Sequence, residues 1–264
     1  MPIGECRLCK ETRELQNSHF IPAAFYKAAK KSDPSGEHPI VVTKNVVMQT
    51  SKQATAPLLC AECENRFNKF GEKWTLANSW QVDGSFPLRM AVRSKRPSYS
   101  KPGFRIYETA GLAGVDHGQL VYFGASLVWR ASINDWHLVE PSPKLHLGPY
   151  EEALRLFLLG RADFPANAAI VLSISAETDV RASAMAVFPY YKNHNKDCRQ
   201  YDFTMNGLTF DLFVGRSLPL AYRSRCLWRS PNRPVFFAAS MDSQVVQEFG
   251  GMLSTAKTVG RLAK

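Results

Sequence analysis

No stretch of this chain approaches the roughly 20 consecutive apolar residues that a membrane-spanning helix needs. The first ten residues, MPIGECRLCK, lack the apolar core of a secretory signal peptide. Charged residues make up only 21% of the chain against 45% hydrophobic residues, which excludes a highly charged disordered protein. We therefore expect a folded, cytoplasmic protein without a membrane partner.

Acidic residues are scarce relative to basic ones. The chain has 23 Asp and Glu against 33 Lys and Arg, which gives a formal charge of +10 and a pI near 9.4. This imbalance favours a polyanionic partner without naming one. The length of 264 residues corresponds to one large domain or two small ones, at roughly 150 residues per domain.

The six cysteines do not follow the pattern of a secreted disulfide framework. Four of them form two C-x2-C pairs, Cys6 with Cys9 and Cys60 with Cys63, a pattern typical of metal ligation. Four thiolates complete a closed tetrahedral zinc site, which leaves no open position for catalysis and is therefore structural. The alternative is a set of free thiols in ordinary loops.

Composition divides the chain into three parts, and the predicted fold class is α+β. We expect a zinc-binding module at 1–80, a basic linker rich in Gly, Pro and Ser at 81–104, and a domain of helices and antiparallel sheet at 105–264. Within the last part, hydrophobic periodicity and turn residues predict helices at 120–132 and 149–159, strands at 167–175, 183–191 and 234–240, a hairpin turning at Asn206-Gly207, and a helical tail at 242–264.

The most informative segment joins both cysteine pairs to a short motif. The first pair is followed by S-H-x-I-P at 18–22, and the second lies within L-C-x2-C-E-x2-F at 59–67. This combination resembles the zinc-bearing branch of the HNH nucleases, which have a treble-clef or ββα-metal fold. The chain is also similar to bacterial uncharacterised proteins with an S-H-I-I-P segment and a later helix containing Phe and Trp-Arg, here Phe123 to Arg130.

The resemblance implies roles for individual residues. His19 matches the general base that removes a proton from the attacking water, and the ordinary histidine pKa near 6.5 suits this task. Glu64 stands where the family has its last metal ligand, and a carboxylate there suits Mg²⁺ or Mn²⁺. Glu64, Asn68 and Glu72 are spaced i, i+4, i+8, which predicts one helix face along which a catalytic cation could bind.

Two departures from the family pattern leave alternatives open. Ser18 stands where the family often has an aspartate ligand, and the family's middle asparagine has no clean counterpart before the second cysteine pair. His19 is alternatively a packed histidine that donates to a backbone carbonyl, and the acidic helix face is alternatively a solvated surface.

Two basic stretches carry interleaved aromatic residues, a combination suited to phosphates and bases. The first contains no acidic residue between Leu88 and Arg105, and the second surrounds Tyr222 and Trp228. The alternative is a solvated basic surface. The predicted nucleic-acid-binding residues are Arg89, Arg93, Lys95, Arg96, Arg223, Arg225 and Arg229.

These observations predict an HNH-like endonuclease that hydrolyses phosphodiester bonds, with structural Zn²⁺ and catalytic Mg²⁺ or Mn²⁺. The expected partner is a nucleic acid, with DNA favoured over RNA, and a protein partner could bind the second domain. The resemblance permits a role in bacterial anti-phage defence. The alternatives are a non-catalytic, zinc-stabilised nucleic-acid-binding or regulatory protein and a protein-interaction scaffold.

Overall fold

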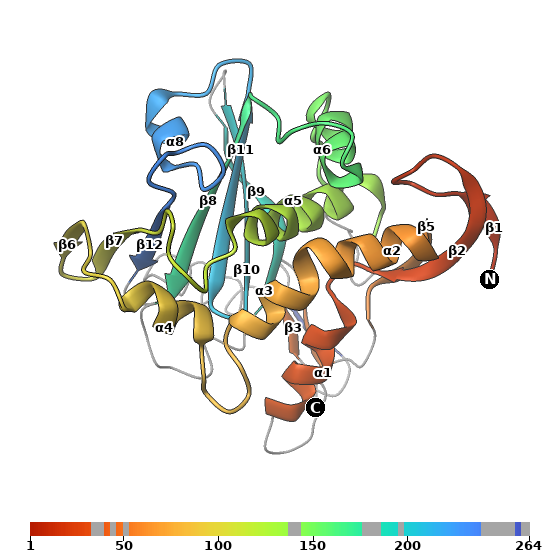
Figure 1. Ribbon diagram of the computed structural model, residues 1–264. Helices are drawn as coiled ribbons and strands as arrows, with labels where there is room; N and C mark the ends of the chain where they lie inside the picture. The colour runs from red at the N-terminus through yellow and green to blue at the C-terminus, as the bar shows by residue number, and fades with distance from the viewer. Residues whose placement is uncertain are drawn as a thin grey trace.

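Short strands rich in β-branched and aromatic residues form the centre of this α+β protein, seen in the computed structural model of Figure 1. The structure describes residues 1–32, 40–42, 46–49, 53–136, 144–175, 186–194, 198–238 and 257–259. Within these residues the α+β prediction is confirmed, because helices pack on mixed and antiparallel sheets.

The N-terminal part is a small antiparallel sheet followed by helical segments. Its strand order is β1-β2-β5, and β5 leads directly into a continuous helical run. The middle of that run, η1, is a π-helical turn of five residues. The elements of this part are β1 (Ile3–Glu5), β2 (Thr12–His19), α1 (Ala23–Ser32), β5 (Thr55–Cys60), α2 (Ala61–Phe67), η1 (Asn68–Glu72) and α3 (Lys73–Asn78).

A seven-stranded sheet forms the larger part, in the order β6-β7-β12-β8-β11-β10-β9. Neighbouring strands are antiparallel except for the parallel pair β12 and β8. Its strands are β6 (Tyr99–Lys101), β7 (Phe104–Glu108), β8 (Ala168–Ser175), β9 (Ala186–His194), β10 (Cys198–Met205), β11 (Leu208–Gly215) and β12 (Pro234–Ala238).

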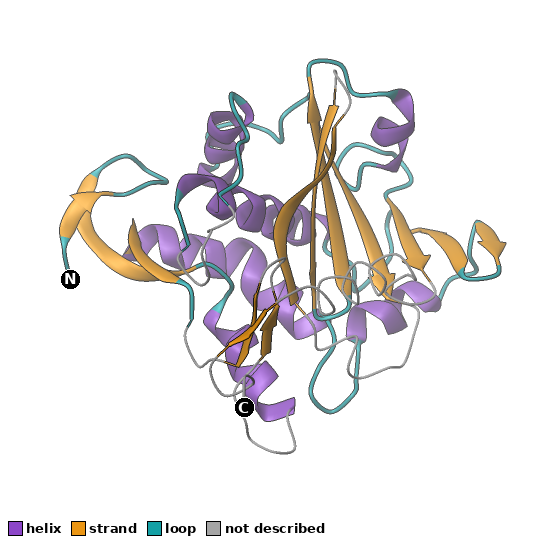
Figure 2. Ribbon diagram, turned by 180° about the vertical axis from the view of Figure 1, so that it is seen from behind, coloured by secondary structure: helices purple, strands orange, loops and turns teal. Residues whose placement is uncertain are grey.

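Within the described residues four helices accompany this sheet, and a third sheet of three strands has the order β13-β4-β3. Figure 2 shows the helices and sheets from behind. The helices are α4 (Pro87–Arg93), α5 (His117–Ile133), α6 (Tyr150–Leu159) and α8 (Leu220–Arg225), and the strands of the third sheet are β3 (Ile40–Val42), β4 (Val46–Gln49) and β13 (Lys257–Val259).

Helix α5 lies at the centre of the core, and this position explains why its sequence is apolar on all sides. Every residue from Leu120 to Ile133 is buried, because the sheet covers one side of the helix and η1 covers another. Two glycines allow this close approach. A Cβ atom at Gly124 would lie 2.8 Å from Cδ1 of Phe210 on the sheet, and one at Gly71 would lie 3.0 Å from the backbone nitrogen of Phe123.

The turn at Asn206-Gly207 and the helix end at Gly160 have the backbone conformations that their sequences predict. Asn206 and Gly207 have φ angles of 49° and 76° and connect β10 to β11, as expected for a type I′ turn. Gly160 ends α6 in the left-handed conformation with a φ of 75°. The helices and strands predicted between residues 120 and 238 are therefore confirmed where the structure describes them.

Two predictions need correction. The expected linker at 81–104 contains α4 and β6, and its Phe86, Leu88 and Val92 are buried. The sequence does not predict α4, because its seven residues are too few to show a clear hydrophobic periodicity. The predicted helical tail is wrong at Lys257–Val259, which is a strand paired with β4, and the rest of that tail lies outside the described residues.

Candidate functional site

The four predicted zinc ligands converge. The sulfur atoms of Cys6, Cys9, Cys60 and Cys63 all lie within 4.8 Å of one another. A tetrahedral site with Zn–S bonds of about 2.3 Å separates its sulfurs by about 3.8 Å, so the cluster has the size and the donor chemistry of a zinc site. Among the described residues, no other group of three or more His, Cys, Asp or Glu comes this close together.

The first cysteine pair lies in the tight turn between β1 and β2. The backbone nitrogen of Lys10 donates to the carbonyl oxygen of Cys6 at 2.9 Å, and Lys10 has a φ of 67°. The backbone nitrogen of Cys6 in turn donates to the carbonyl of Glu11 at 2.9 Å. These bonds close the turn, so that both sulfurs are held on one side of it.

The second cysteine pair begins helix α2. Cys60 is the last residue of β5 and the N-cap of α2, and Cys63 lies in the first turn of the helix. The positive end of a helix stabilises thiolates. The backbone nitrogen of Cys60 also donates to Sγ of Cys6 at 3.4 Å, which links the two pairs directly.

The close approach of the sulfurs shifts the pKa values of Cys6 and Cys63 in opposite directions. A hydrogen bond with Cys63, assisted by backbone N–H groups, lowers the pKa of Cys6 to about 4. The same bond and burial raise the pKa of the Cys63 thiol. Four thiolates this close together would repel one another, and a bound Zn²⁺ would supply the compensating charge.

A later helix anchors the first cysteine turn. Leu8, between the two cysteines, is fully buried, and the guanidinium of Arg155 on α6 donates to its carbonyl oxygen. Arg155 also makes two 2.7 Å bonds to the carboxylate of Glu152. The turn is therefore fixed by a residue almost 150 positions away, which no local sequence pattern signals.

His19 is the last residue of β2 and is half-buried. In the β2–β5 register it faces Thr55, whereas Cys60 faces Leu15 at the opposite end of the pair. Its ring centroid lies 6.4 Å from that of Tyr26 on α1. His19 and the cysteine cluster thus occupy opposite ends of one strand pair.

Ser18, the neighbour of His19, is bonded inside the strand pair. Its side chain is buried, and Oγ accepts a hydrogen bond from the backbone nitrogen of Leu59 at 3.1 Å. The hydroxyl therefore stabilises the register between β2 and β5.

The predicted helix face of Glu64, Asn68 and Glu72 is interrupted by the π turn. Asn68 and Glu72 line a hollow of about 440 Å³ together with Pro22 and Phe25. Glu64 does not line this hollow, and its buried Oε1 has no hydrogen-bond partner in the part of the chain that the structure describes. Two of the three predicted oxygen ligands are therefore brought together, and the third lies apart.

Glu72 is already paired with a cation. Its Oε1 accepts a hydrogen bond from Arg130 of α5, whose side chain is only 3% exposed. Arg130 also donates to the carbonyl of Phe20 at 3.3 Å, and its guanidinium lies 4.5 Å from the ring centroid of Phe67. This arginine connects α5 to the residue after His19, a function that sequence reasoning missed.

The predicted nucleic-acid-binding residues fall into two groups. Exposed side chains are found at the end of α4, in the turn after it, and on α8. Arg89 is half-buried, with its guanidinium 5.0 Å from the ring centroid of Phe86. The exposed members are Arg93, Lys95, Arg96, Arg223, Arg225 and Arg229.

Arg229 has a different environment from the other predicted arginines. Its guanidinium donates to the carbonyls of Pro165 at 2.8 Å and Ala168 at 3.2 Å, and also to that of Phe164. These bonds hold the segment that leads into β8. The arginine therefore supports the fold at this position.

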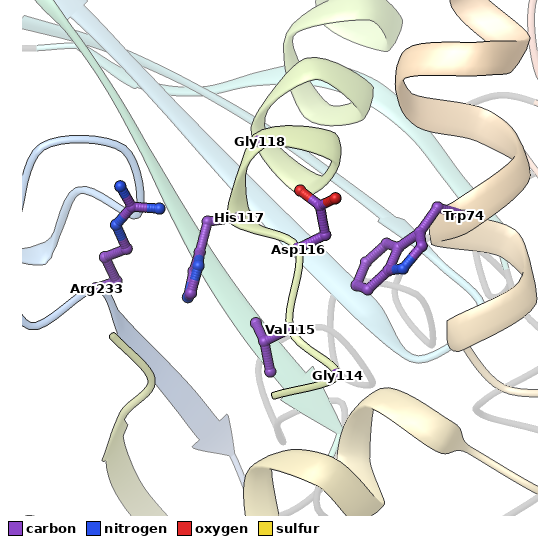
Figure 3. A pocket seen from close by; sticks show the side chains of 7 residues that line it. All are labelled: Trp74, Gly114, Val115, Asp116, His117, Gly118 and Arg233. Atoms are coloured by element: carbon purple, nitrogen blue, oxygen red, sulfur yellow. The ribbon is translucent and has the colours of Figure 1, made fainter. Parts of the chain in front are cut away.

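A second hollow, of about 390 Å³, lies at the start of α5 (Figure 3). Asp116 caps the helix by accepting from the backbone nitrogen of Gln119 at 3.0 Å. Thr109 gives its only hydroxyl hydrogen to the carbonyl of Arg233 at 2.6 Å, so at 2.8 Å it accepts from Nε2–H of His117. Burial and the nearby Arg233 lower the pKa of His117 to about 4, so it is a neutral structural histidine.

Comparison of the chain with protein-family models, curated proteins and solved structures found no match. Among the described residues, no helix is both long and apolar enough to span a membrane.

Proposed function

We propose that this protein is a metal-dependent endonuclease whose N-terminal part is an HNH-like, ββα-metal module. The observation that carries the proposal is the order of elements: β2 ends in His19, β5 pairs with it antiparallel, and α2 follows β5 directly, with the cysteine cluster at the junction. This is the arrangement of hairpin, histidine and cysteine-bearing helix that the HNH resemblance implies.

In this proposal His19 is the general base. It is half-buried at a strand end, so it can contact both solvent and a phosphate bound beside the module. A neutral imidazole removes a proton from the water that attacks phosphorus, and a positioned base contributes about a hundred- to ten-thousandfold to the rate.

Oxygen ligands for Mg²⁺ or Mn²⁺ would come from α2 and η1. Glu64 fits best, because its buried Oε1 has no hydrogen-bond partner among the described residues. Glu72 fits less well, because Arg130 already neutralises its carboxylate. Asn68 is exposed and offers a neutral oxygen. A bound cation would polarise the phosphate and stabilise the leaving oxygen.

Specific observations favour a second candidate, a non-catalytic nucleic-acid-binding protein stabilised by zinc. Ser18 stands at the position of the family's aspartate ligand, and its hydroxyl is used within the strand pair. The Glu72 carboxylate is used by Arg130. Both candidates share the exposed basic residues as the surface for a nucleic acid, DNA in preference to RNA. A role in anti-phage defence belongs to the first candidate.

Cleavage of single- and double-stranded DNA and RNA with Mg²⁺ or Mn²⁺ tests the proposal. His19→Ala should lower the cleavage rate about a hundredfold or more, with unchanged zinc content and circular dichroism. The matched control is His146→Ala, which removes an exposed histidine. Glu64→Gln should instead raise the cation concentration that half-maximal cleavage requires.

The outcomes separate the two candidates. Cleavage that survives His19→Ala undiminished would remove the active site from the N-terminal module. No cleavage on any substrate, combined with salt-dependent binding, would replace the nuclease with the non-catalytic candidate.

A further inference from the structure

A hollow of about 640 Å³ lies on the face of the seven-stranded sheet opposite α5. Phe210 of β11 faces α5, as its contact with Gly124 shows. Side chains alternate along a strand, so Phe213, three residues later, points to the other face. There it stacks on Tyr222 of α8, with ring centroids 4.1 Å apart. The hollow includes both of these residues and has the size of a small-ligand pocket.

The two basic stretches, far apart in sequence, meet at this hollow. Lys101 of β6 comes from the first stretch and Arg225 of α8 from the second, and both line the hollow with exposed side chains. In Figures 1 and 2, α8 lies towards the edge of the sheet that β6 and β7 form. The rim therefore carries positive charge contributed by two separate elements, which suits an anionic ligand.

Aromatic rings line the interior. Phe104 and Tyr222 are half-buried, so each ring is partly accessible, and Phe213 and Phe236 are buried beneath them. Phe104 packs on Phe236, with centroids 5.9 Å apart. An accessible ring that is supported from below suits a flat, apolar ligand group, because little side-chain freedom is lost on binding.

Gln200 and Asp211 offer hydrogen-bond acceptors to the interior of the hollow. The amide nitrogen of Gln200 donates to Asp211 at 2.7 Å and to Asp202 at 3.0 Å. Both of its hydrogens are thereby used, and Gln200 Oε1 remains as an acceptor beside the Asp211 carboxylate. Acceptors inside a cationic rim suit a ligand with N–H donors at one end and negative charge at the other.

We propose that this hollow binds unpaired nucleotides of a single-stranded nucleic acid. The bases pack on Phe104 and Tyr222, their amino groups donate to Asp211 and Gln200, and the phosphates contact Lys101 and Arg225. A duplex cannot bind in this way, because its base faces are stacked on one another. This inference rests on the proposed function only in that a nucleic acid is the ligand. It adds that the bound nucleic acid is single-stranded.

The test is fluorescence anisotropy with a mixed-sequence oligonucleotide of about 12 nucleotides, as DNA and as RNA, and with its duplex. No Mg²⁺ or Mn²⁺ is added, so binding is measured without cleavage. The wild-type protein should bind the single strand more tightly than the duplex. Phe104→Ala and Tyr222→Ala should each weaken single-strand binding about five- to a hundredfold, which is the range for loss of one base stack.

A second pair of variants keeps the test valid if the aromatic variants are unstable. Lys101→Gln and Arg225→Gln change exposed side chains, and each should lower the log-log salt slope for single strands by about 0.7 if it removes one phosphate contact. Arg161→Gln is the matched charge control, and Tyr191→Leu is the matched aromatic control. Arg161 and Tyr191 are exposed and do not line the hollow.

Each outcome decides either this inference or the proposed function. Equal or tighter duplex binding, or single-strand binding unchanged in all four variants, would overturn the inference and leave His19-dependent cleavage unaffected. Loss of binding in the variants of a protein that never cleaves would support the inference while the nuclease proposal fails. A protein that binds neither form fails the inference outright.

Discussion

Replacing Cys60 with serine should release the metal and unfold the region around the first two strands. The structure gives the scale. Leu8, Leu15, Leu58 and Leu59 are buried leucines of the segments that carry the cysteines, and each contributes about 1.5–3 kcal/mol when fully buried, or about 6–12 kcal/mol together. A structural zinc contributes about 10–16 kcal/mol in zinc-finger peptides, which is as large as that sum or larger. Loss of the metal should therefore remove a stabilisation at least comparable with that of these apolar contacts.

Elemental analysis by mass spectrometry, thermal denaturation and limited proteolysis measure this effect together. The wild-type protein should carry one zinc per chain, and Cys60→Ser should lose it, melt at a lower temperature and become cleavable near the first cysteine pair. Cys226→Ser is the control, because Cys226 is buried at 1% exposure and lies outside the cluster. A Cys60→Ser protein with full zinc content and an unchanged melting temperature would refute the assignment, as would zinc-free wild-type protein.

Three further predictions follow from other parts of the molecule. Glu72→Ala leaves the charge of Arg130 buried, so chemical denaturation should show a loss of about 3–5 kcal/mol, and wild-type stability in this variant would contradict the pairing. Folding lowers the pKa of His117 to about 4, so the free energy of unfolding should fall as pH drops from about 6.5 towards 4, by up to about 1.4 kcal/mol per pH unit. His117→Gln should flatten this dependence, and parallel stability curves for the variant and the wild type would contradict the assignment to His117. A variant in which glutamine replaces the exposed residues Arg93, Lys95 and Arg96 should lower the log-log salt slope of duplex binding by about two to three units. An unchanged slope would show that these residues do not contact the nucleic acid.

The sequence specifies much of this fold through local chemistry. The Asn206-Gly207 turn needs positive φ angles, which asparagine and glycine adopt readily, and the structure has them. The cysteine spacing likewise predicted which sulfurs converge, because each C-x2-C pair is confined to a tight turn or to a helix start. Such features depend on only a few neighbouring residues.

Other features depend on contacts that no local pattern encodes. Glu72 looked like a ligand on a helix face, but Arg130, 58 residues away, binds its carboxylate. Arg229 looked like part of a basic surface, but its partners are backbone carbonyls of the segment before β8. Carbonyl acceptors have no sequence signature, so arginines of this kind cannot be separated from surface arginines before the fold is known.

The π turn of η1 has a consequence for how this protein could change over evolutionary time. Its five residues separate α2, whose first turn carries Cys63, from α3, whose first turn carries Trp74. Removing one residue would rotate one end against the other by about 100°, so the cysteine cluster and the Trp74 side of the start of α5 could not both keep their positions. Lys69 of this turn is exposed, so we expect its identity to be less constrained than the length of the turn. Across lineages we expect the length of this segment to stay fixed while its exposed residues change. This constraint would be seen as a lack of insertions and deletions and not as conserved residue identities.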